Sequence, residues 1–372
     1  SSTYIMKHLL EETLGAKVGL IGTNGNMIGE EFMHAERTTP ESYELQKLFR
    51  QMADAGCTHV VMEVSSHSLI LERVAGIEFD VGIYTNLSQD HLDFHNTMEE
   101  YAEAKSRLFS HCRIGCYNAD DDWADMMARN AKCPMISYSA IGADADLTAK
   151  DISLSSSNVR FMAMDKSGSA ETVLNIPGMF SVYNALGVMA AGRALGISIE
   201  DCAAAIGTAK GVKGRMEVVP TDGDYSILID YSHKPDALEK VLKTLRPVTR
   251  GRLMALFGCG GDRDRIKRPI MGAIAADNAD ICIVTSDNPR TEDPEAIIAE
   301  IIPGTENKHA LVKNICDRIE AIHWAIDNAC PGDVILLAGK GHEDYQEINH
   351  VKHHMDEREI VADYLEQRKR AR

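Results

Sequence analysis

The sequence lacks several features that would identify a class of protein at once. No apolar run approaches the roughly 20 residues that a membrane-spanning helix needs, and no signal peptide opens the chain. The nine cysteines include no C-x-x-C pair, and the closest set, His111, Cys112 and Cys116, has no matching second half for a zinc site. We therefore expect reduced thiols and a cytoplasmic protein that does not bind membranes.

Positive charge is also scarce. The chain has 39 Lys and Arg against 56 Asp and Glu, which gives a formal net charge of −17. A general nucleic-acid binder needs a surplus of Lys and Arg for its phosphate contacts, so nucleic acid is not an expected partner. Small anions can still bind in local basic pockets, and nothing in the sequence indicates an obligate protein partner.

A phosphate-binding loop is suggested at residues 17–29, KVGLIGTNGNMIG, but its working end is missing. A Walker loop, G-x-x-x-x-G-K-[ST], needs a lysine for the outer phosphates and a hydroxyl for magnesium, and Asn26 and Met27 hold those positions. Asn-Gly between two strand-like runs is instead a hairpin signal. Residues 26–34 also lack the helical pattern that must follow a phosphate loop. We predict a β-hairpin here.

Helical and strand patterns alternate through the first half of the chain. Strand patterns in CTHVVMEVSSH and FDVGIYTNLSQDHLDFH each run into polar residues, and alternating segments at residues 147–176 predict a small antiparallel patch. Alternation of this kind predicts a mostly parallel sheet, whose ligands bind beyond the carboxyl ends of the strands. Helices are predicted at about residues 4–14, 41–55, 98–109, 180–195 and 199–209.

Two domains are expected, because 372 residues exceed the size at which one core stops growing. Gly and Lys cluster in AKGVKGRMEVV, and strand patterns resume after it. We place the boundary there, with one α/β domain at residues 1–212 and a second, Rossmann-like α/β domain at residues 213–372.

Two residues of the first domain could form a metal centre. Glu63 ends one predicted strand, and His91 follows another together with Asp90 and Asp93, so a carboxylate and an imidazole could meet above the sheet edge and hold magnesium. The alternatives are a helix cap for Glu63 and a solvated turn around His91. Lys105 lies within an amphipathic helical pattern, which by itself predicts a surface lysine.

Charged loops follow the strand patterns of the second domain. FGCGGDRDRIKRP lacks the third glycine of a dinucleotide fingerprint, which argues against a nicotinamide oxidoreductase, and it contains Arg263. In SDNPRTEDP, Asn-Pro forces an extended turn from which Arg290 projects. The two arginines could bind a carboxylate bidentately, or they could belong to a surface salt-bridge network. AGKGHEDY adds Gly339, which permits close backbone approach, and Glu343, an acceptor for an ammonium group.

Ten motifs in register resemble one family across nearly the whole chain. The family is that of the Mur ligases, in particular those that add the third residue to UDP-N-acetylmuramoyl-L-alanyl-D-glutamate. The motifs, in order, are ERTTPES, MEVSSHSL, TNLSQDHLDFH, EAKSRLF, YNALGVMAAG, GRMEVV, DYSHKPDALE, FGCGGDRDRIKRP, SDNPRTEDP and AGKGHEDYQ.

The resemblance implies a fold and a reaction. Residues 1–212 would be the central ATP-binding domain, and residues 213–372 the C-terminal Rossmann-like domain for the incoming amino acid. ATP would activate the D-glutamyl carboxylate as an acyl phosphate, with Mg²⁺ as cofactor. The amine of meso-diaminopimelate would then form the amide in a step of peptidoglycan precursor synthesis. The partners would be these small molecules.

The resemblance also implies roles for single residues. Glu63, His91 and Lys105 would be catalytic metal ligands, with Lys105 carbamylated. The D-N-P-R motif goes with meso-diaminopimelate, whose second carboxylate would pair with Arg290; lysine would leave that guanidinium unpaired, which is costly. Some members have a glutamine at the position of Leu71. The other implied contacts are Thr38, Thr39, Ser65 and Arg73 for the peptide part of the nucleotide substrate, Asn184, Arg215 and Asp230 for ATP, and Arg263, Asp287, Asn288, Gly339 and Glu343 for the amino acid.

The first prediction concerns turnover by this chain. In the family, a G-T-N-G-K-T loop directly precedes the helix that begins here at Ser1, so the N-terminal domain and the phosphate loop lie outside this sequence. Phosphoryl transfer relies on positioning and charge neutralisation, so we expect these 372 residues alone to be very slow or inert, and at most to bind the amino acid. Phosphate release with both substrates measures this, and turnover at rates typical of enzymes would contradict it.

Overall fold

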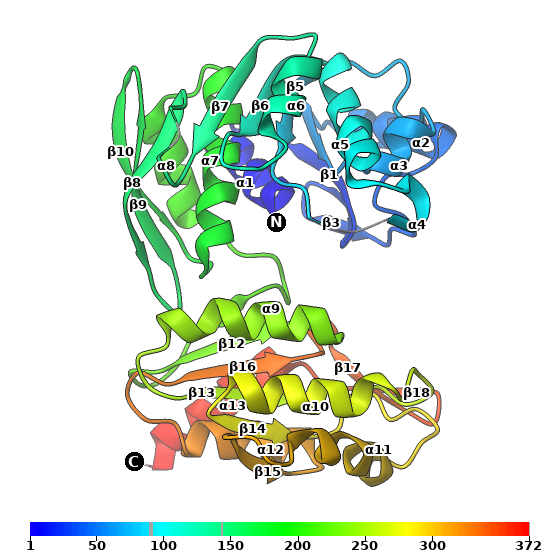
Figure 1. Cartoon of the computed structure of the whole chain (residues 1–372), viewed down its shortest axis with the longest axis vertical. Helices are drawn as coiled ribbons and strands as arrows, with labels where there is room; N and C mark the ends of the chain where they lie inside the picture. The colour runs from blue at the N-terminus through cyan, green and yellow to red at the C-terminus, as the bar shows by residue number, and fades with distance from the viewer. Residues whose placement is uncertain (89–91, 143, 372) are drawn as a thin grey trace. The chain divides into compact units, whose positions relative to one another are not determined.

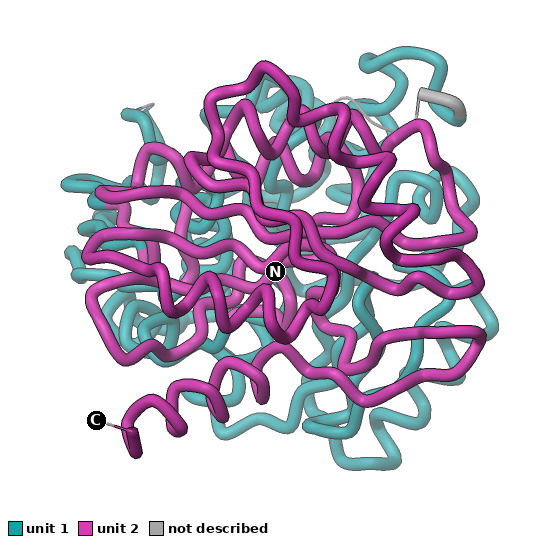
Figure 2. Tube along the Cα trace, turned by 90° about the horizontal axis from the view of Figure 1, so that it is seen from below, with its two compact units in different colours: residues 1–153, 159–175, 179–210 teal, residues 154–158, 176–178, 211–372 magenta. Residues whose placement is uncertain are grey.

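The computed structural model describes residues 1–88, 92–142 and 144–371 of the chain. These residues form two compact units, shown in different colours in Figure 2. Unit 1 comprises Ser1–Ser153, Val159–Asn175 and Met179–Lys210, and unit 2 comprises Leu154–Asn158, Ile176–Gly178 and Gly211–Arg372. Within the described ranges, no helix combines the length and apolar character needed to cross a membrane.

Unit 1 contains two sheets. The first has the order β3-β2-β1-β4, and the second has the order β10-β9-β8-β7-β6-β5. The strands of the first sheet are β1 (Val18–Gly22), β2 (Gly25–Ile28), β3 (Glu31–Met33) and β4 (His59–Met62). Those of the second are β5 (Phe79–Tyr84), β6 (Cys112–Asn118), β7 (Met135–Ser139), β8 (Leu147–Leu154), β9 (Val159–Asp165) and β10 (Gly168–Leu174).

The five helices predicted in unit 1 are present as α1, α2, α5, α7 and α8, whereas the short helices α3, α4 and α6 were not predicted. α1 ends at Gly15, which has a left-handed φ of +60° that suits glycine. α7 lies against the six-stranded sheet (Figure 1) and is apolar nearly all round, as expected of a buried helix. The helices are α1 (Ser2–Leu14), α2 (Ser42–Asp54), α3 (Ser66–Ile70), α4 (Leu92–His95), α5 (Met98–Ser106), α6 (Ala124–Asn130), α7 (Met179–Ala194) and α8 (Ile199–Thr208).

The hairpin predicted in place of a phosphate loop is confirmed. β1 and β2 pair antiparallel with Gly22 opposite Gly25, so Thr23 and Asn24 form the loop between them. β1 also pairs with β4 in parallel, and this places the hairpin loop beside the carboxyl end of β4. The following residues form β2 and β3 rather than a helix.

The antiparallel patch predicted at residues 147–176 is only partly right. β9 and β10 do pair antiparallel. However, β8 runs parallel to β7, with Tyr138 opposite Leu147, so these segments extend the six-stranded sheet instead of forming a patch of their own. The sequence pattern indicates strands, but it does not specify which neighbour each strand pairs with.

Unit 2 has the predicted Rossmann-like architecture. Its sheet has the order β11-β12-β16-β13-β14-β15, in which β12, β16, β13, β14 and β15 are parallel and β11 is antiparallel. All residues of β13, β14 and β16 are buried, as in a sheet covered on both faces. The strands are β11 (Glu217–Val219), β12 (Ser226–Asp230), β13 (Leu253–Phe257), β14 (Ile281–Val284), β15 (Leu311–Asn314) and β16 (Val334–Ala338).

The helices of unit 2 cover this sheet, and a short hairpin stands apart from it. α9 and α10 lie side by side, and α12 and α13 contribute to the apolar core that contains β13 and β16 (Figure 1). The helices are α9 (Pro235–Leu245), α10 (Lys267–Asn278), α11 (Pro294–Ile301), α12 (Arg318–Asp327) and α13 (Glu357–Ala371). The hairpin consists of β17 (Tyr345–Ile348) and β18 (Val351–His354).

A fully buried ion pair holds the carboxyl ends of two strands of unit 2 together. Arg318, at the start of α12, donates from Nε to Oε1 of Glu357 at 2.9 Å. Its two remaining nitrogens donate to the backbone oxygens of Ser286, just after β14, and Ala338, the last residue of β16, at 3.3 and 2.9 Å. Both charged side chains are almost completely excluded from solvent.

The second prediction tests this ion pair. Glu357→Gln leaves the Arg318 guanidinium buried without a countercharge, so we expect a loss of about 3–5 kcal/mol in the free energy of unfolding. Urea unfolding of the full chain measures the loss. The matched control is Glu78→Gln, which breaks an exposed pair with Arg113 and should have little effect. Equal effects of the two variants would contradict the role assigned to Arg318.

Candidate functional site

Glu63 lies directly after β4, and its carboxylate faces the hairpin loop between β1 and β2. Its Oε2 accepts hydrogen bonds from Oγ1 of Thr23 at 2.6 Å and from the backbone N–H of Thr23 at 3.3 Å. The pKa of Tyr4, in the first turn of α1, is raised mainly by burial and secondly by the Glu63 carboxylate. The negative charge of Glu63 therefore acts electrostatically on that turn. Oε1 of Glu63 accepts no hydrogen bond from the described residues.

The residues assigned to the peptide part of the substrate gather around Glu63. Oγ1 of Thr38 lies 3.0 Å from Oγ1 of Thr23, the same hydroxyl that bonds to Glu63. Thr39 is buried, and its hydroxyl donates to the backbone oxygen of Glu63 at 2.9 Å and accepts from the N–H of Ser65 at 3.0 Å. Parts of the chain that are 24 to 40 residues apart are thus joined by short hydrogen bonds.

Arg73 completes this group. Its Nη1 donates to the backbone oxygen of Thr39 at 3.2 Å, and its Nη2 pairs with Glu41 at 2.9 Å. Its Nε is buried and has no hydrogen-bond partner in the described part of the chain. The structure therefore brings Thr38, Thr39, Ser65 and Arg73 to the same end of β4 as Glu63.

Lys105 lies in the last turn of α5, half-buried rather than on the open surface. Its Nζ lies 5.2 Å from the centre of the Tyr101 ring, and that ring stacks on the buried His95. His91, the third predicted ligand, lies outside the described residues. Proximity of the three predicted metal ligands therefore stays a prediction.

The donor chemistry around Glu63 fits magnesium. The carboxylate has one oxygen that is not used by its neighbours, and the nearby hydroxyls of Thr23 and Thr38 are further oxygen donors, which Mg²⁺ prefers. Among the described residues, which leave out His91, no cluster of three or more His, Cys, Asp and Glu side chains could hold a metal ion. Magnesium at Glu63 would therefore need further ligands, such as water or substrate oxygens.

Asn184, assigned to ATP binding, lies on α7 beside the start of α1. Its Oδ1 accepts a hydrogen bond of 3.0 Å from Oγ of Ser2. The two other residues assigned to ATP lie in unit 2.

In unit 2, Arg215 and Asp230 lie beside Tyr231 at the carboxyl end of β12. The Arg215 guanidinium lies over the Tyr231 ring, 5.3 Å from its centre. Asp230 is buried and accepts from Ser232 and from the N–H of Met216, and burial raises the pKa of its carboxyl. The pKa of Tyr231 is raised by burial and then by the carboxylate of Glu343, so the residues assigned to ATP lie close to one assigned to the amino acid.

The loops that follow β14 and β16 meet at one group of buried polar side chains. Asn288 donates from Nδ2 to Oε2 of Glu343 at 2.9 Å. Gly339 has a φ of +111°, and a Cβ there would lie 2.8 Å from Oδ2 of Asp287, so the position requires glycine. Asp287, Asn288, Gly339 and Glu343 are thus brought together, at the strand ends that Arg318 holds.

Lys340 stands at the centre of this group, and sequence reasoning missed it. Its side chain is fully buried, and its ammonium donates to Oδ1 of Asn288 and to Oε2 of Glu343, both at 2.8 Å. A buried lysine with no countercharge would be very costly, so the position and charge of Glu343 are coupled to it. Its only signal in the sequence was the lysine between two glycines in AGKGHEDY.

Arg263 and Arg290 lie close together, as expected for neighbouring strand-end loops. Both side chains approach Gly260: a Cβ added there would be 2.9 Å from Nη1 of Arg290 and 3.7 Å from Cγ of Arg263. Arg263 is exposed, whereas the Arg290 side chain keeps 17% of its exposure and pairs through Nε with Glu347 at 3.1 Å. The sequence argument that Arg290 lacks a partner in the absence of a second carboxylate is therefore wrong, because Glu347 already supplies one.

Another buried arginine holds the charged loop of residues 257–269. Arg268 is fully buried and bonds to both oxygens of Glu292 at 2.8 and 2.9 Å, and to Glu300 at 2.8 Å. Oε1 of Glu292 also accepts the backbone N–H of Asp262 at 2.6 Å. The hydrogen bonds from Arg268 are the main cause that lowers the pKa of Glu292 to about 2.

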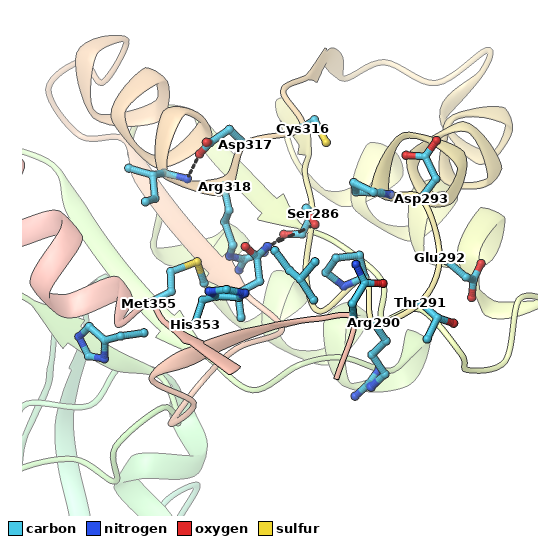
Figure 3. A pocket seen from close by; sticks show the side chains of 17 residues that line it. Ser286, Arg290, Thr291, Glu292, Asp293, Cys316, Asp317, Arg318, His353 and Met355 are labelled. Atoms are coloured by element: carbon cyan, nitrogen blue, oxygen red, sulfur yellow. Dashed lines mark hydrogen bonds between the residues drawn. The ribbon is translucent and has the colours of Figure 1, made fainter. Parts of the chain in front are cut away.

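A cavity of about 770 Å³ lies on another side of the loop that carries Arg290. Of the residues assigned to the amino acid, only Arg290 lines it. Figure 3 shows the Arg290 side chain extending away from Ser286 and Arg318, which also line the cavity. The guanidinium thus points toward Gly260 and Gly261 instead.

Comparison with known proteins identifies two family models in this chain. Residues 1–192 match the Mur ligase middle domain, and residues 214–341 match the domain described as Mur ligase, glutamate ligase domain. Together they cover well over half of the chain.

The chain is similar to curated ligases along nearly its whole length. It is 47% identical over 369 residues to UDP-N-acetylmuramoyl-L-alanyl-D-glutamate--2,6-diaminopimelate ligase 1 of Clostridium acetobutylicum, covering 99% of this chain and 76% of that protein. It is 46% identical over 366 residues to the ligase of the same name from Caldanaerobacter subterraneus subsp. tengcongensis, covering 98% and 75%.

Solved structures agree with this similarity. One of a UDP-N-acetylmuramoyl-L-alanyl-D-glutamate--2,6-diaminopimelate ligase matches with a TM-score of 0.79 at 36% identity, over 99% of this chain and 76% of that chain. A UDP-N-acetylmuramate-alanine ligase from Thermotoga maritima matches with a TM-score of 0.62 at 18% identity, over 100% and 73%, which supports the fold alone.

The third prediction concerns the acid side of the stability profile. The pKa of Glu292 in the folded chain is below the ordinary value of 4.5, so its stabilising effect is complete above pH 4.5 and is lost as the pH falls toward 2. Glu292→Gln should cost roughly 1–3 kcal/mol in the free energy of unfolding at pH 6. The difference from the wild-type chain should shrink as the pH falls below 4.5.

Urea unfolding of both chains between pH 6 and pH 3 measures this difference. Glu306→Gln, a change of the same kind at an exposed position, is the control and should show a small difference that does not vary with pH. A difference for Glu292→Gln that stayed constant with pH would mean that its carboxylate does not carry the stabilisation.

Proposed function

Because the chain belongs to the Mur ligase family, we propose that it carries the metal-binding and amino-acid-binding parts of an ATP-dependent ligase that adds meso-diaminopimelate to UDP-N-acetylmuramoyl-L-alanyl-D-glutamate. The names of its relatives, at 46–47% identity along nearly the whole chain, support this reaction. The single structural observation that carries the proposal is the meeting of Arg263 and Arg290 beside the Asp287, Asn288 and Glu343 group.

The amino acid would be held in unit 2 by charge complementarity. The guanidinium groups of Arg290 and Arg263 would bind its distal carboxylate. Glu343, fixed by Lys340 and Asn288, would accept a hydrogen bond from an ammonium group of the ligand. A zwitterion with an additional carboxylate matches this set of side chains, because its distal carboxylate and one of its ammonium groups would each meet an opposite charge.

The reaction would join this amine to the D-glutamyl carboxylate of the nucleotide substrate. After phosphoryl transfer from ATP has produced an acyl phosphate, the amine forms the new C–N bond and the C–O bond to phosphate breaks. Thr38, Thr39, Ser65 and Arg73 would orient the peptide part of the substrate near Glu63. Asn184, Arg215 and Asp230 would contact ATP.

Magnesium would bind at Glu63, whose Oε1 accepts no hydrogen bond from the described residues. When bound, it would neutralise phosphate charge, which is the main requirement of phosphoryl transfer. Glu63 would hold it through Oε1, while Thr23 keeps Oε2 in place. His91 and a carbamylated Lys105 are the further proposed ligands.

The expected partners of the chain are these small molecules. We propose that it acts in the cytoplasm, where ATP is present and where its nine unpaired cysteines would remain reduced.

The fourth prediction tests the amino-acid site. Titration calorimetry of the full chain should detect binding of meso-diaminopimelate. In Arg290→Gln the dissociation constant for meso-diaminopimelate should rise about tenfold or more, because a charge-assisted bond to its distal carboxylate is lost, while lysine binding should not weaken.

The control for this prediction is Arg265→Gln, which removes an exposed arginine of the neighbouring loop that pairs with Glu300. It should leave both dissociation constants unchanged. If Arg290→Gln raised the dissociation constants of meso-diaminopimelate and lysine equally, the assignment of Arg290 to the distal carboxylate would be contradicted.

A further inference from the structure

Glu347, on β17, holds the guanidinium of Arg290 and is given no role by the family resemblance. Its Oε2 accepts the Nε–H of Arg290 at 3.1 Å, and the two side chains keep 21% and 17% of their exposure. At this degree of burial, the pair is shielded from most of the solvent, so the charge of Glu347 acts on Arg290 more strongly than an exposed partner would.

The backbone fixes the same two residues against each other. The N–H of Arg290 donates to the backbone oxygen of Glu347 at 3.0 Å, and the N–H of Asn349 donates to the backbone oxygen of Arg290 at 2.8 Å. Arg290 has a left-handed φ of 51°, which a non-glycine residue adopts only when its surroundings hold it there. The pairing is therefore built into the loop and does not depend on two free side chains meeting.

This arrangement leaves one edge of the guanidinium available. A carboxylate can bind a guanidinium bidentately along the Nε and Nη2 edge or along the Nη1 and Nη2 edge. Glu347 takes Nε, and Gly261 accepts one hydrogen from Nη1 at 2.8 Å, while no described residue bonds to Nη2. A ligand carboxylate would then share Arg290 with Glu347.

We propose that Glu347 is a specificity-determining residue of the amino-acid site, whose carboxylate balances the charge of Arg290 and so limits the preference for a ligand with a second carboxylate. This inference rests on the proposed function, because Arg290 is the group that would receive that carboxylate. Glu347 repels the distal carboxylate of meso-diaminopimelate. In a complex with lysine, it offsets the repulsion between Arg290 and the side-chain ammonium of the ligand.

Removing the charge of Glu347 should therefore shift the two affinities in opposite directions. In Glu347→Gln, an amide oxygen can still accept the Nε–H of Arg290, but the countercharge is gone. Meso-diaminopimelate should bind more tightly and lysine more weakly. The dissociation constant of lysine divided by that of meso-diaminopimelate should therefore rise about three- to tenfold.

Titration calorimetry with the full chain tests this proposal, with meso-diaminopimelate and lysine as the probes. Glu347→Ala is the second variant and should raise the ratio in the same direction. Glu359→Gln is the matched control. It removes one negative charge from α13, where Glu359 forms an exposed pair with His354 of the same hairpin, and it should leave the ratio unchanged. In an Arg290→Gln background, Glu347→Gln should raise the ratio less, because only the direct interaction between Glu347 and the ligand remains to be removed.

The outcomes separate this inference from the function on which it rests. If the wild-type chain prefers meso-diaminopimelate and neither Glu347 variant raises the ratio, the inference is overturned and the proposed function stands. If the wild-type chain binds neither amino acid, the proposed amino-acid site is overturned, and the inference with it.

Discussion

The buried Arg318 guanidinium is the interaction on which the site in unit 2 depends. It bonds to the backbone where β14 and β16 end, two strands that are separated in the sheet by β13. Both loops of the amino-acid site start from these two points. Burial of this charge is tolerable only because Glu357 pairs with it. The cost of separating that pair keeps the two strand ends in a fixed relation.

The same principle recurs at Lys340 and Arg268. Each is a fully buried cation, and each bonds to at least one acceptor on another segment of the chain: Lys340 to Asn288 as well as to Glu343 of its own loop, and Arg268 to Glu292 and to Glu300 of α11. Buried cations of this kind are costly in isolation but specify a single arrangement of their partners, because every alternative leaves a charge unpaired. For the proposed amino-acid site, this would fix the positions of several charges in advance, so that little ordering would be needed when a zwitterion binds.

Much of the fold could be predicted from the sequence because its signals are local. The hairpin followed from Asn-Gly between two strand-like runs, and α1 followed from its apolar pattern and Gly15. The pairing of β8 with β7 could not be predicted in this way, because strand partners are set by contacts between distant segments. The site shows the same division. Its strand-end residues could be placed by motif, whereas Lys340 and Glu347 became visible only once the structure showed which side chains they meet.

The hairpin loop that imitates a phosphate loop in sequence has a structural role of its own. Its residue Thr23 bonds through one hydroxyl to Glu63 and lies within 3.0 Å of the hydroxyl of Thr38. A carboxylate with a single free oxygen is better suited to hold a metal than one that can rotate, because less conformational freedom is lost on binding. The glycine at the start of the loop serves this arrangement, since a Cβ at Gly22 would lie 3.1 Å from Oε1 of Glu63, the oxygen that the proposed metal site would use. The resemblance to a nucleotide loop thus arises from the small residues that bring a backbone turn close to a carboxylate.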